Sequence, residues 1–505
     1  MGYSQEFMPH YGFAIDLRKC IGCHACTIAC KAEHEIPVGV NRCWVKTVEK
    51  GTFPDTRRFF FPVLCNQCDD APCVRICPTS ALYKRRDGIV DLNSAACIGC
   101  RACMVACPYD QLFIDPNTRT AEKCNFCANR VENKLLPACV SVCPTECRIF
   151  GDLEDPASDV YKFVQGNGVT VRKPEKGTMP HVYYVGTEES AIQPEIATRP
   201  FYFKEGSVSL RPLGSPTPDP QMPGAPRVDY DTPHIKPWGL DMAIYLLTKG
   251  IATGSLMLSV VLWLLGFRDT LTMIAGPAVA LLMITITAAV LVVDLEQPQR
   301  FLYILTRPNW DSWLTRGAFI LTAFGALTTA WLGAAWMGWE GVLRAIAWPA
   351  LVAGFFATIY TGFLFAQGLA RDLWQGPHST IDLFAQAVAE GAAVMLLLAF
   401  VPGLTSSAEV VAALSWTLFG AIAVHLVLIL IENVLMPSAT LHHELAVRAI
   451  RRGAFARKFW GGAVLCGVAS LMMVTLAPVA ALLALVASFA WEHVWVEAGQ
   501  SVPLS

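Results

Sequence analysis

The hydrophobic pattern of the chain changes near Trp238. From there onward, long apolar runs alternate with short polar stretches. A helix needs about 20 mostly apolar residues to cross a bilayer. A buried soluble helix would explain any single run, but a long succession of them favours an all-α membrane domain over residues 238–497, with a tail at 498–505. We expect eight transmembrane helices, near residues 238–267, 271–293, 313–338, 344–370, 382–402, 410–436, 459–477 and 478–496.

Residues 1–200 carry no such runs and are long enough for one separate domain. Between the two regions, residues 201–237 are rich in proline. Proline-rich segments adopt extended conformations and act as spacers. The sequence therefore predicts a linker over 201–237.

Charged positions predict how the membrane domain is oriented. Eight helices place both termini on one side of the membrane. Positive residues concentrate in cytoplasmic loops, and the loops on the terminal side are the basic ones. They contain Arg300, Arg307, Arg316, Arg371, Arg448, Arg451, Arg452, Arg457 and Lys458, whereas the opposite loops offer Arg268 and Arg344. With no signal sequence apparent, we expect a multi-pass protein of the bacterial inner membrane, its N-terminal domain on the cytoplasmic side.

Cysteine dominates the chemistry of the N-terminal region. Sixteen of the nineteen cysteines lie between residues 20 and 143, in four groups of four. The first and third groups have the C-x2-C-x2-C-x3-C spacing of bacterial ferredoxins, in which the fourth cysteine ligates the other cluster of a pair. The sequence predicts an α+β ferredoxin-like domain with four [4Fe–4S] clusters. The quartets are Cys20, Cys23, Cys26, Cys30; Cys65, Cys68, Cys73, Cys77; Cys97, Cys100, Cys103, Cys107; and Cys124, Cys127, Cys139, Cys143.

Other uses of cysteine fit this pattern less well. Structural zinc takes two C-x2-C pairs per ion and gives no reason for three-cysteine runs followed by C-x3-C-Pro. Disulfide scaffolds are short secreted chains. Cys20 to His24 matches the C-x-x-C-H haem attachment pattern, but Cys26 and Cys30 continue the ferredoxin run. Cys43, Cys147 and Cys466 lie outside the quartets and are expected to be small buried side chains.

Residues 10–150 resemble the four-cluster electron-transfer subunit of complex iron–sulfur molybdoenzymes, and the resemblance covers all sixteen cysteines. It implies interleaved ligands. The first three cysteines of each quartet then share a cluster with the last cysteine of another quartet. Cys143 joins the first quartet and Cys30 the fourth. Cys107 joins the second quartet and Cys77 the third. The resemblance also implies a separate molybdopterin catalytic subunit, with molybdenum or tungsten.

The C-terminal region resembles the polysulfide-reductase-type (NrfD-like) membrane anchor, which binds quinone and no haem. Short segments at helix ends carry this resemblance, in the expected order: Tyr245–Gly250 with Gly254, Asp294–Pro298 with Arg300, Trp313 with Arg316 and Gly317, Tyr360–Gly362, and Ala498–Gln500. The two modules are usually separate polypeptides, and their fusion here is a departure from that pattern. The quinone type, menaquinone or ubiquinone, stays open.

A quinone site needs hydrogen-bond partners for two carbonyl oxygens and a route for protons. Four charged residues near the terminal side of the membrane domain suit these roles, as does a tyrosine deeper in the fourth predicted helix, which could donate to a quinone oxygen. The alternative for the charged ones is an ion-pair network at the interface or arginines that reach up to the lipid headgroups. The candidates are Asp241, Asp294, Arg300, Arg316 and Tyr360.

Four ionisable residues lie deeper: Lys249, Glu390, His425 and Glu432. Charges within a membrane are costly and tend to pair or to line proton paths. His425 and Glu432 are two helical turns apart and share one helix face. This predicts either a polar seam between helices, which we favour, or a proton path. His425 is the only deep histidine, which argues against a haem anchored by two axial ligands.

Two classes of function remain. In the first, the chain joins a separate catalytic subunit to the quinone pool, with oxidation of sulfite or formate as one reaction and reduction of a sulfur or N/S-oxide compound as the alternative. In the second, it is an electron-transfer or ion-coupling module of a respiratory complex without a molybdoenzyme. The net charge of −2 gives no indication of nucleic-acid binding. Without a nucleotide fingerprint or a pterin-sized domain, the chain is not expected to be a complete enzyme.

Overall fold

In a computed structural model, the chain forms two units, which divide at Pro237 and Trp238. The first unit also takes in residues 368–370 and 502–505. The structure describes residues 8–197, 202–204, 207–209, 224–472 and 475–505. Much of the predicted linker lies outside these residues.

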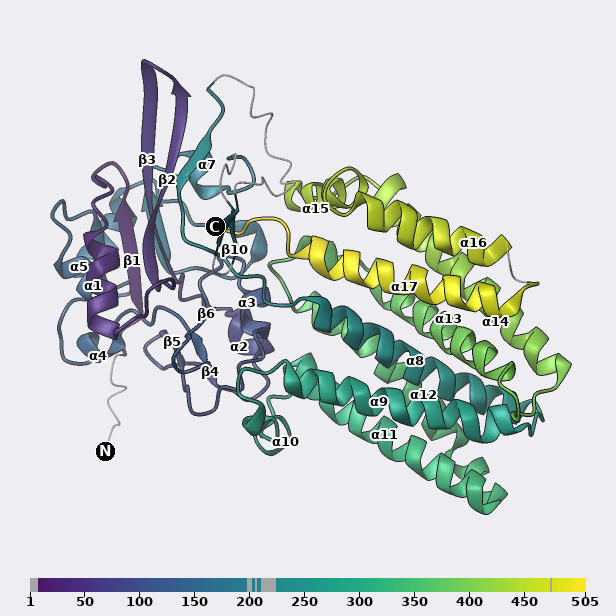
Figure 1. Cartoon of the computed structure of the whole chain (residues 1–505). Helices are drawn as coiled ribbons and strands as arrows, with labels where there is room; N and C mark the ends of the chain where they lie inside the picture. The colour runs from purple at the N-terminus through teal and green to yellow at the C-terminus, as the bar shows by residue number, and fades with distance from the viewer. Residues whose placement is uncertain (1–7, 198–201, 205–206, 210–223, 473–474) are drawn as a thin grey trace, which may run out of the picture. The chain divides into compact units, whose positions relative to one another are not determined.

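Two three-stranded sheets form the framework of the first unit (Figure 1). In one, β1 (Tyr11–Asp16) lies between antiparallel β8 (Arg148–Asp152) and parallel β9 (Val182–Val185). In the other, β2 (Cys43–Thr52) pairs along its full length with β3 (Asp55–Leu64) and also with β12 (Arg227–Tyr230). Two-stranded ribbons complete the set: β4 (Leu82–Lys84) with β5 (Val90–Leu92), β6 (Phe113–Ile114) with β7 (Ala121–Glu122), and β10 (Tyr202–Lys204) with β11 (Ser207–Ser209).

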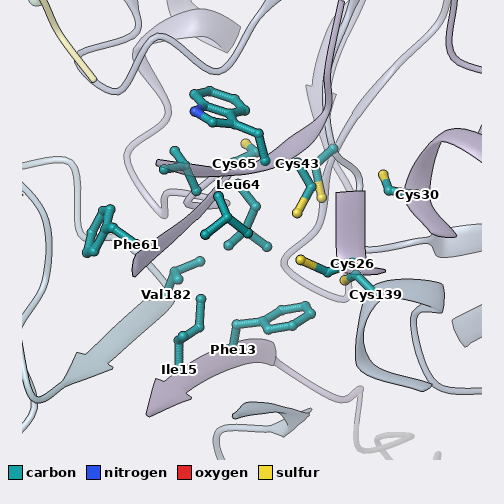
Figure 2. Packing of buried hydrophobic residues seen from close by; sticks show 14 of the residues in the cluster. Phe13, Ile15, Cys26, Cys30, Cys43, Phe61, Leu64, Cys65, Cys139 and Val182 are labelled. Carbon is teal, nitrogen blue, oxygen red and sulfur yellow. The ribbon is translucent and has the colours of Figure 1, made fainter. Parts of the chain in front are cut away.

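Short helices carry much of the cysteine-rich sequence. The helices of this unit are α1 (Ala25–His34), α2 (Pro72–Ile76), α3 (Ala102–Ala106), α4 (Ala128–Val131), α5 (Ala138–Ser141), α6 (Asp159–Gly166), η1 (Pro174–Lys176) and α7 (Glu189–Ile192). The hydrophobic core combines side chains of the two sheets, such as Phe13, Phe61 and Val182, with cysteines (Figure 2). Cys26, Cys30 and Cys139 belong to this core, so the cysteine loops are part of the packing.

The linker prediction is wrong for its last residues. β12 is a strand of the β2–β3 sheet, and the segment after it is held by buried polar contacts. Trp44 donates its indole N–H to Asp231 at 2.8 Å, and His234 pairs with Asp110 at 2.7 Å. Burial disfavours a charged imidazole, yet Asp110 and Asp231 outweigh it and raise the pKa of His234 to about 9. Pairing of this kind cannot be read from the proline content.

The second unit is a helical bundle (Figure 1). Seven of its described helices are long and apolar enough to cross a membrane. They are α8 (Leu240–Leu264), η2 with α9 (Leu271–Val293), α11 (Trp313–Met337), α12 (Glu340–Ala366), α13 (Ser379–Ala399), α14 with η5 (Ala408–Leu435) and α17 (Ala477–Gly499). The shorter elements are η3 (Pro298–Arg300), α10 (Tyr303–Thr306), η4 (Asp372–Gln375) and α15 (Leu441–Arg451).

The eighth predicted span, 459–477, is not confirmed at full length. Its place is taken by η6 (Lys458–Leu465) and α16 (Cys466–Met472), a shorter apolar helix over Lys458–Met472 that packs along α17. Fifteen residues at 1.5 Å per residue span about 22 Å, less than the roughly 30 Å of a bilayer core. The apolar run predicted a helix longer than the one described, which reaches Met472, and residues 473–474 lie outside the described residues.

The predicted tail also differs. α17 continues to Gly499, and the next residue is held in place by hydrogen bonds. Gln500 accepts a hydrogen bond from the Trp238 amide at 3.0 Å and donates to the Trp238 carbonyl at 2.9 Å. This pairing joins the two ends of the helical unit.

Glycines allow α8 and α13 to pack backbone to backbone. A Cβ added at Gly254 would lie 1.8 Å from the Ala387 carbonyl oxygen, and one at Gly391 would lie 2.3 Å from the Gly254 carbonyl carbon. Small residues at helix interfaces are the common way for membrane helices to approach this closely.

We expect Gly254→Leu to destabilise the helical unit strongly, because its side chain would overlap the α13 backbone, which cannot rotate away as a side chain can. The loss of stability is measured by heating the protein in detergent and monitoring the fraction that remains folded by size-exclusion chromatography. Gly325→Leu is the matched control, since a Cβ there meets nothing within 4 Å. Equal stability of the two variants would contradict the close contact.

Candidate iron–sulfur and quinone sites

The first and third cysteine groups adopt the same backbone conformation. Gly22 and Gly99 each follow an isoleucine between two cysteines, and both have φ of 69°. His24 and Arg101 follow the second cysteine, and both have φ of 59°. Left-handed conformations at these positions suit glycine and turn the chain tightly. The two loops therefore present their cysteines in matching ways, as the shared C-x2-C-x2-C spacing predicts.

Helix packing pairs the four groups. α1 carries Cys26 and Cys30, and it packs against α5, which carries Cys139. α2 carries Cys73 and packs against α3, which carries Cys103. The first group is thus joined to the fourth, and the second to the third.

Interactions between thiols follow the same pairing. Burial raises the pKa of Cys30 to about 12, and the neighbouring Cys139 and Cys127 add to that rise. Burial likewise raises the pKa of Cys107 to about 12, and the charge of Cys65 adds to that rise. The last cysteine of the first group thus interacts with two cysteines of the fourth, and the last of the third group with the first cysteine of the second.

A small cavity shows this arrangement directly. Among the residues that line it are four cysteines, Cys97, Cys100 and Cys103 from the third group and Cys77 from the second. Backbone amides point toward these sulfurs: Leu82 donates to Cys77 at 3.5 Å and Ala121 donates to Cys97 at 3.4 Å. Four convergent thiols with amide donors fit a [4Fe–4S] cluster, whose ligands are thiolates stabilised by N–H groups.

Within the described residues no two cysteines form a disulfide, and this includes the three outside the quartets. Cys43 and Cys147 are buried, as the sequence predicts, but they lie beside the predicted ligands. The Cys43 thiol interacts with that of Cys26 and lowers its pKa to about 5, and the Cys147 sulfur lies 3.5 Å from that of Cys143. The contact of Cys43 with Cys26 could not be predicted from the sequence, because Cys43 lies between two quartets and is distant from both along the chain.

Tyr360 lies in a buried polar group within the helical unit. Its hydroxyl bonds to that of Tyr245 on α8, and Tyr245 also contacts the Thr361 hydroxyl at 3.1 Å. Lys249 donates to Thr361 at 2.5 Å and to the Thr358 carbonyl at 3.1 Å. Its ammonium group lies over both tyrosine rings, 5.5 and 5.4 Å from their centres.

The other quinone-site candidates occupy helix ends. Asp241 lies in the first turn of α8, with one carboxylate oxygen buried and without a hydrogen-bond partner among the described residues. Asp294 follows α9 directly, and Arg300 ends η3. Arg316, in the first turns of α11, donates to the Trp310 carbonyl at 2.6 Å and lies over the Trp313 ring. Their roles at a quinone stay predictions.

The α11 helix also supports Tyr360. A Cβ at Gly317 would lie 2.1 Å from the Tyr360 ring, so the glycine after Arg316 leaves the space that the ring fills. The sequence marks Tyr245 only as part of the Tyr245–Gly250 segment, and its pairing with Tyr360 depends on the packing of α8 on α12.

His425 belongs to a polar seam between helices. Its Nδ1 lies 2.6 Å from an Asp382 oxygen, and the other oxygen of Asp382 accepts from Trp491 at 3.0 Å and from Gln386 at 2.7 Å. These residues come from α13, α14 and α17, so polar side chains of three helices meet here. The partner of His425 is Asp382, which lies at the end of a predicted span and to which sequence reasoning assigned no role.

Glu390 and Lys249 extend the same polar region. Lys249 has charge interactions with Glu390 and with Glu492 of α17. Glu432 and Glu492 line a small cavity together with Asp382 and Gln386. The sequence analysis did not identify Glu492 as a buried ionisable residue, although an acidic residue inside an apolar run could have indicated it.

Two family models match this chain. The model described as a 4Fe-4S dicluster domain matches residues 56–153. The model described as polysulphide reductase, NrfD, matches residues 230–490, more than half of the chain. The chain belongs to the NrfD family, with an iron–sulfur domain fused before it. It is a multi-pass membrane protein of the electron-transport type.

Curated relatives of this NrfD-family protein match about a third of its length. A subunit of the tetrathionate reductase of Salmonella typhimurium is 43% identical over 188 residues, 36% of this chain and 75% of the relative. A subunit of the polysulfide reductase of Wolinella succinogenes is 42% identical over 188 residues, 36% of this chain and 97% of the relative. Protein NrfC of Escherichia coli K12 is 42% identical over 178 residues, 35% of this chain and 80% of the relative.

Proposed function

We propose that this chain is the electron-transfer and membrane-anchor subunit of a membrane-bound molybdopterin oxidoreductase. It carries electrons between a separate catalytic subunit, which contains molybdenum or tungsten, and quinone in the bilayer. The observation that supports this most is the fusion of a cysteine-rich domain, with its four groups paired by helix packing, to an NrfD helical unit.

We assign four [4Fe–4S] clusters to the sixteen cysteines. Bound clusters would supply one-electron transfer. The chain's own part is to hold the thiols close and buried and to direct amide N–H groups at them. The four sets are Cys20, Cys23, Cys26 and Cys143; Cys124, Cys127, Cys139 and Cys30; Cys65, Cys68, Cys73 and Cys107; and Cys97, Cys100, Cys103 and Cys77.

The loop of the first set suits the exchange of electrons with the catalytic subunit. Cys23 is exposed, and Cys20 is partly exposed. Two large apolar side chains beside them also face solvent: Ile21 is 58% exposed and Ile28, on α1, is 63% exposed. Exposed apolar side chains that gather near a functional group indicate an interface.

For quinone, we propose that the Tyr245–Tyr360–Lys249 group donates hydrogen bonds to a quinone oxygen. Asp241, Asp294, Arg300 and Arg316 then form the polar rim toward the membrane surface. The cavity beside Asp382 has room for about one water molecule and is too small for a quinone ring, which favours a proton-carrying role there.

The direction of electron flow is proposed from the relatives. Two of those described above are subunits of reductases, of tetrathionate and of polysulfide, so we favour quinol-linked reduction of a sulfur or related oxidised compound over the oxidation of sulfite or formate. For orientation, we propose that the cluster domain lies on the cytoplasmic side of the inner membrane. The basic residues of α15, Arg448 and Arg451, support that side.

Mass spectrometry and metal analysis of the complex, purified through a tag on this chain, test the proposal. We expect a co-purifying subunit of pterin-enzyme size, molybdenum or tungsten, and about sixteen iron atoms per chain if each cluster holds four. Iron with a cytochrome partner and no pterin metal would instead favour an electron-transfer module without a molybdoenzyme.

A further inference from the structure

A buried arginine lies among the thiols of two predicted clusters. Arg148 begins β8, five residues after Cys143, and is 3% exposed. Its Nη2 donates to the Cys43 sulfur at 3.1 Å. Its strongest charge interactions are with Cys43, Cys26, Cys139 and Cys147. Cys26 belongs to the set completed by Cys143, and Cys139 to the set completed by Cys30. Figure 2 shows Cys26, Cys139 and Cys43 close together in the core.

The guanidinium group is incompletely satisfied by the protein. Nε and Nη1 have no hydrogen-bond partner within the part of the chain that the structure describes. A buried charge is costly unless it is paired with opposite charge and hydrogen-bonded. The groups around it are cysteine sulfurs, which become anionic when they ligate iron. Thiolate-bound clusters would therefore supply both the counter-charge and the missing acceptors.

A fixed positive charge affects the two oxidation states of a cluster differently. Reduction adds one electron, so a nearby cation stabilises the reduced cluster more than the oxidised one. Cluster potentials depend on net charge and on hydrogen bonds to the sulfurs, and charge interactions are strong in a buried site. We propose that Arg148 is a positioning residue that raises the reduction potentials of the two clusters bound by the first and fourth cysteine groups. This rests on the proposed four-cluster function.

Redox titration of the purified complex, monitored by electron paramagnetic resonance, tests this. In Arg148→Gln we expect two of the cluster transitions to move to lower potential. Each reduction constant should fall about tenfold, which is about 59 mV for a one-electron couple. The transitions of the other two clusters should stay in place. Full iron content with unchanged potentials would overturn the proposal.

Two further variants keep the test decisive. Arg148→Lys retains the charge, so the reduction constants of its two clusters should stay within about threefold of the original values. This comparison still holds if the Gln variant loses iron. A tenfold shift in an iron-replete Lys variant would overturn the role of charge. Arg172→Gln is the matched control. Arg172 is also buried, but its guanidinium lies over the Phe61 and Tyr109 rings, and its loss should leave the two transitions in place.

Separate measurements test the role of Arg148 and the proposed four-cluster function. Iron analysis of the unaltered chain tests the four-cluster assignment, and well below sixteen iron atoms would undermine that assignment itself. Unchanged potentials at full iron content would reject the role of Arg148 alone. Neither readout depends on turnover of substrate or quinone.

Discussion

Cys97→Ser is expected to reduce quinone-linked turnover at least a hundredfold while the helical unit still inserts in the membrane. Cys97 lines the cavity that it shares with Cys77, Cys100 and Cys103, and its sulfur accepts the Ala121 amide. A serine oxygen is a poor substitute for a thiolate iron ligand, so one inner cluster should be lost or altered. Electron transfer along a series of clusters then fails at that point. Quinol oxidation by the purified complex, measured beside iron content, checks this.

Cys466→Ser is the control for this experiment. Cys466 lies in α16, outside the quartets, and its thiol donates to the Gly461 carbonyl. Its replacement should leave iron content and turnover unchanged. Full-rate turnover in Cys97→Ser, with about four iron atoms missing, would mean that the clusters do not act in series.

Tyr360→Phe is expected to lower quinone-linked turnover about tenfold or more, with dye-linked turnover of the catalytic subunit unaffected. The change removes the hydroxyl that bonds to Tyr245 and leaves the ring that fills the space beside Gly317. Removing one positioned donor from a site where charge develops commonly costs 10²–10³ in rate, and Tyr245 keeps a second donor nearby. Steady-state kinetics with a soluble quinol analogue and with dye separate the two activities.

Tyr303→Phe provides the matched control for Tyr360→Phe, since Tyr303 lies at the start of α10 and its ring packs beneath Arg307. It should leave both activities unchanged. Equal loss of quinone-linked and dye-linked turnover in Tyr360→Phe would indicate misassembly, and unchanged quinone kinetics would place the quinone site elsewhere.

Local spacing and hydropathy predicted most of the architecture. The C-x2-C-x2-C pattern predicted the two matching loops at Gly22 and Gly99 because the chain must turn tightly within a few residues to bring three thiols together. Apolar runs predicted eight transmembrane helices, and seven described helices have membrane-spanning length, because a bilayer requires a minimum length of apolar residues. The run over 459–477 was a weaker guide, because the helix described there, Lys458–Met472, is shorter than a membrane span.

Contacts between segments that are distant along the chain could not be predicted from the sequence. β12 joins β2 across a separation that proline content did not suggest, and Asp382 meets His425 only because α13 packs on α14. The Tyr245–Tyr360 pair needs α8 beside α12 and a glycine on α11.

The sequence by itself determined the donor set, the number of cysteine groups and the membrane character, since these follow from residue type and spacing along the chain. Only the tertiary structure decided which side chains share a site. It placed Arg148 among the thiols of two cysteine groups and Lys249 between two tyrosines. The physical reason is that a buried charge can be kept only where folding brings compensating groups from several elements around it.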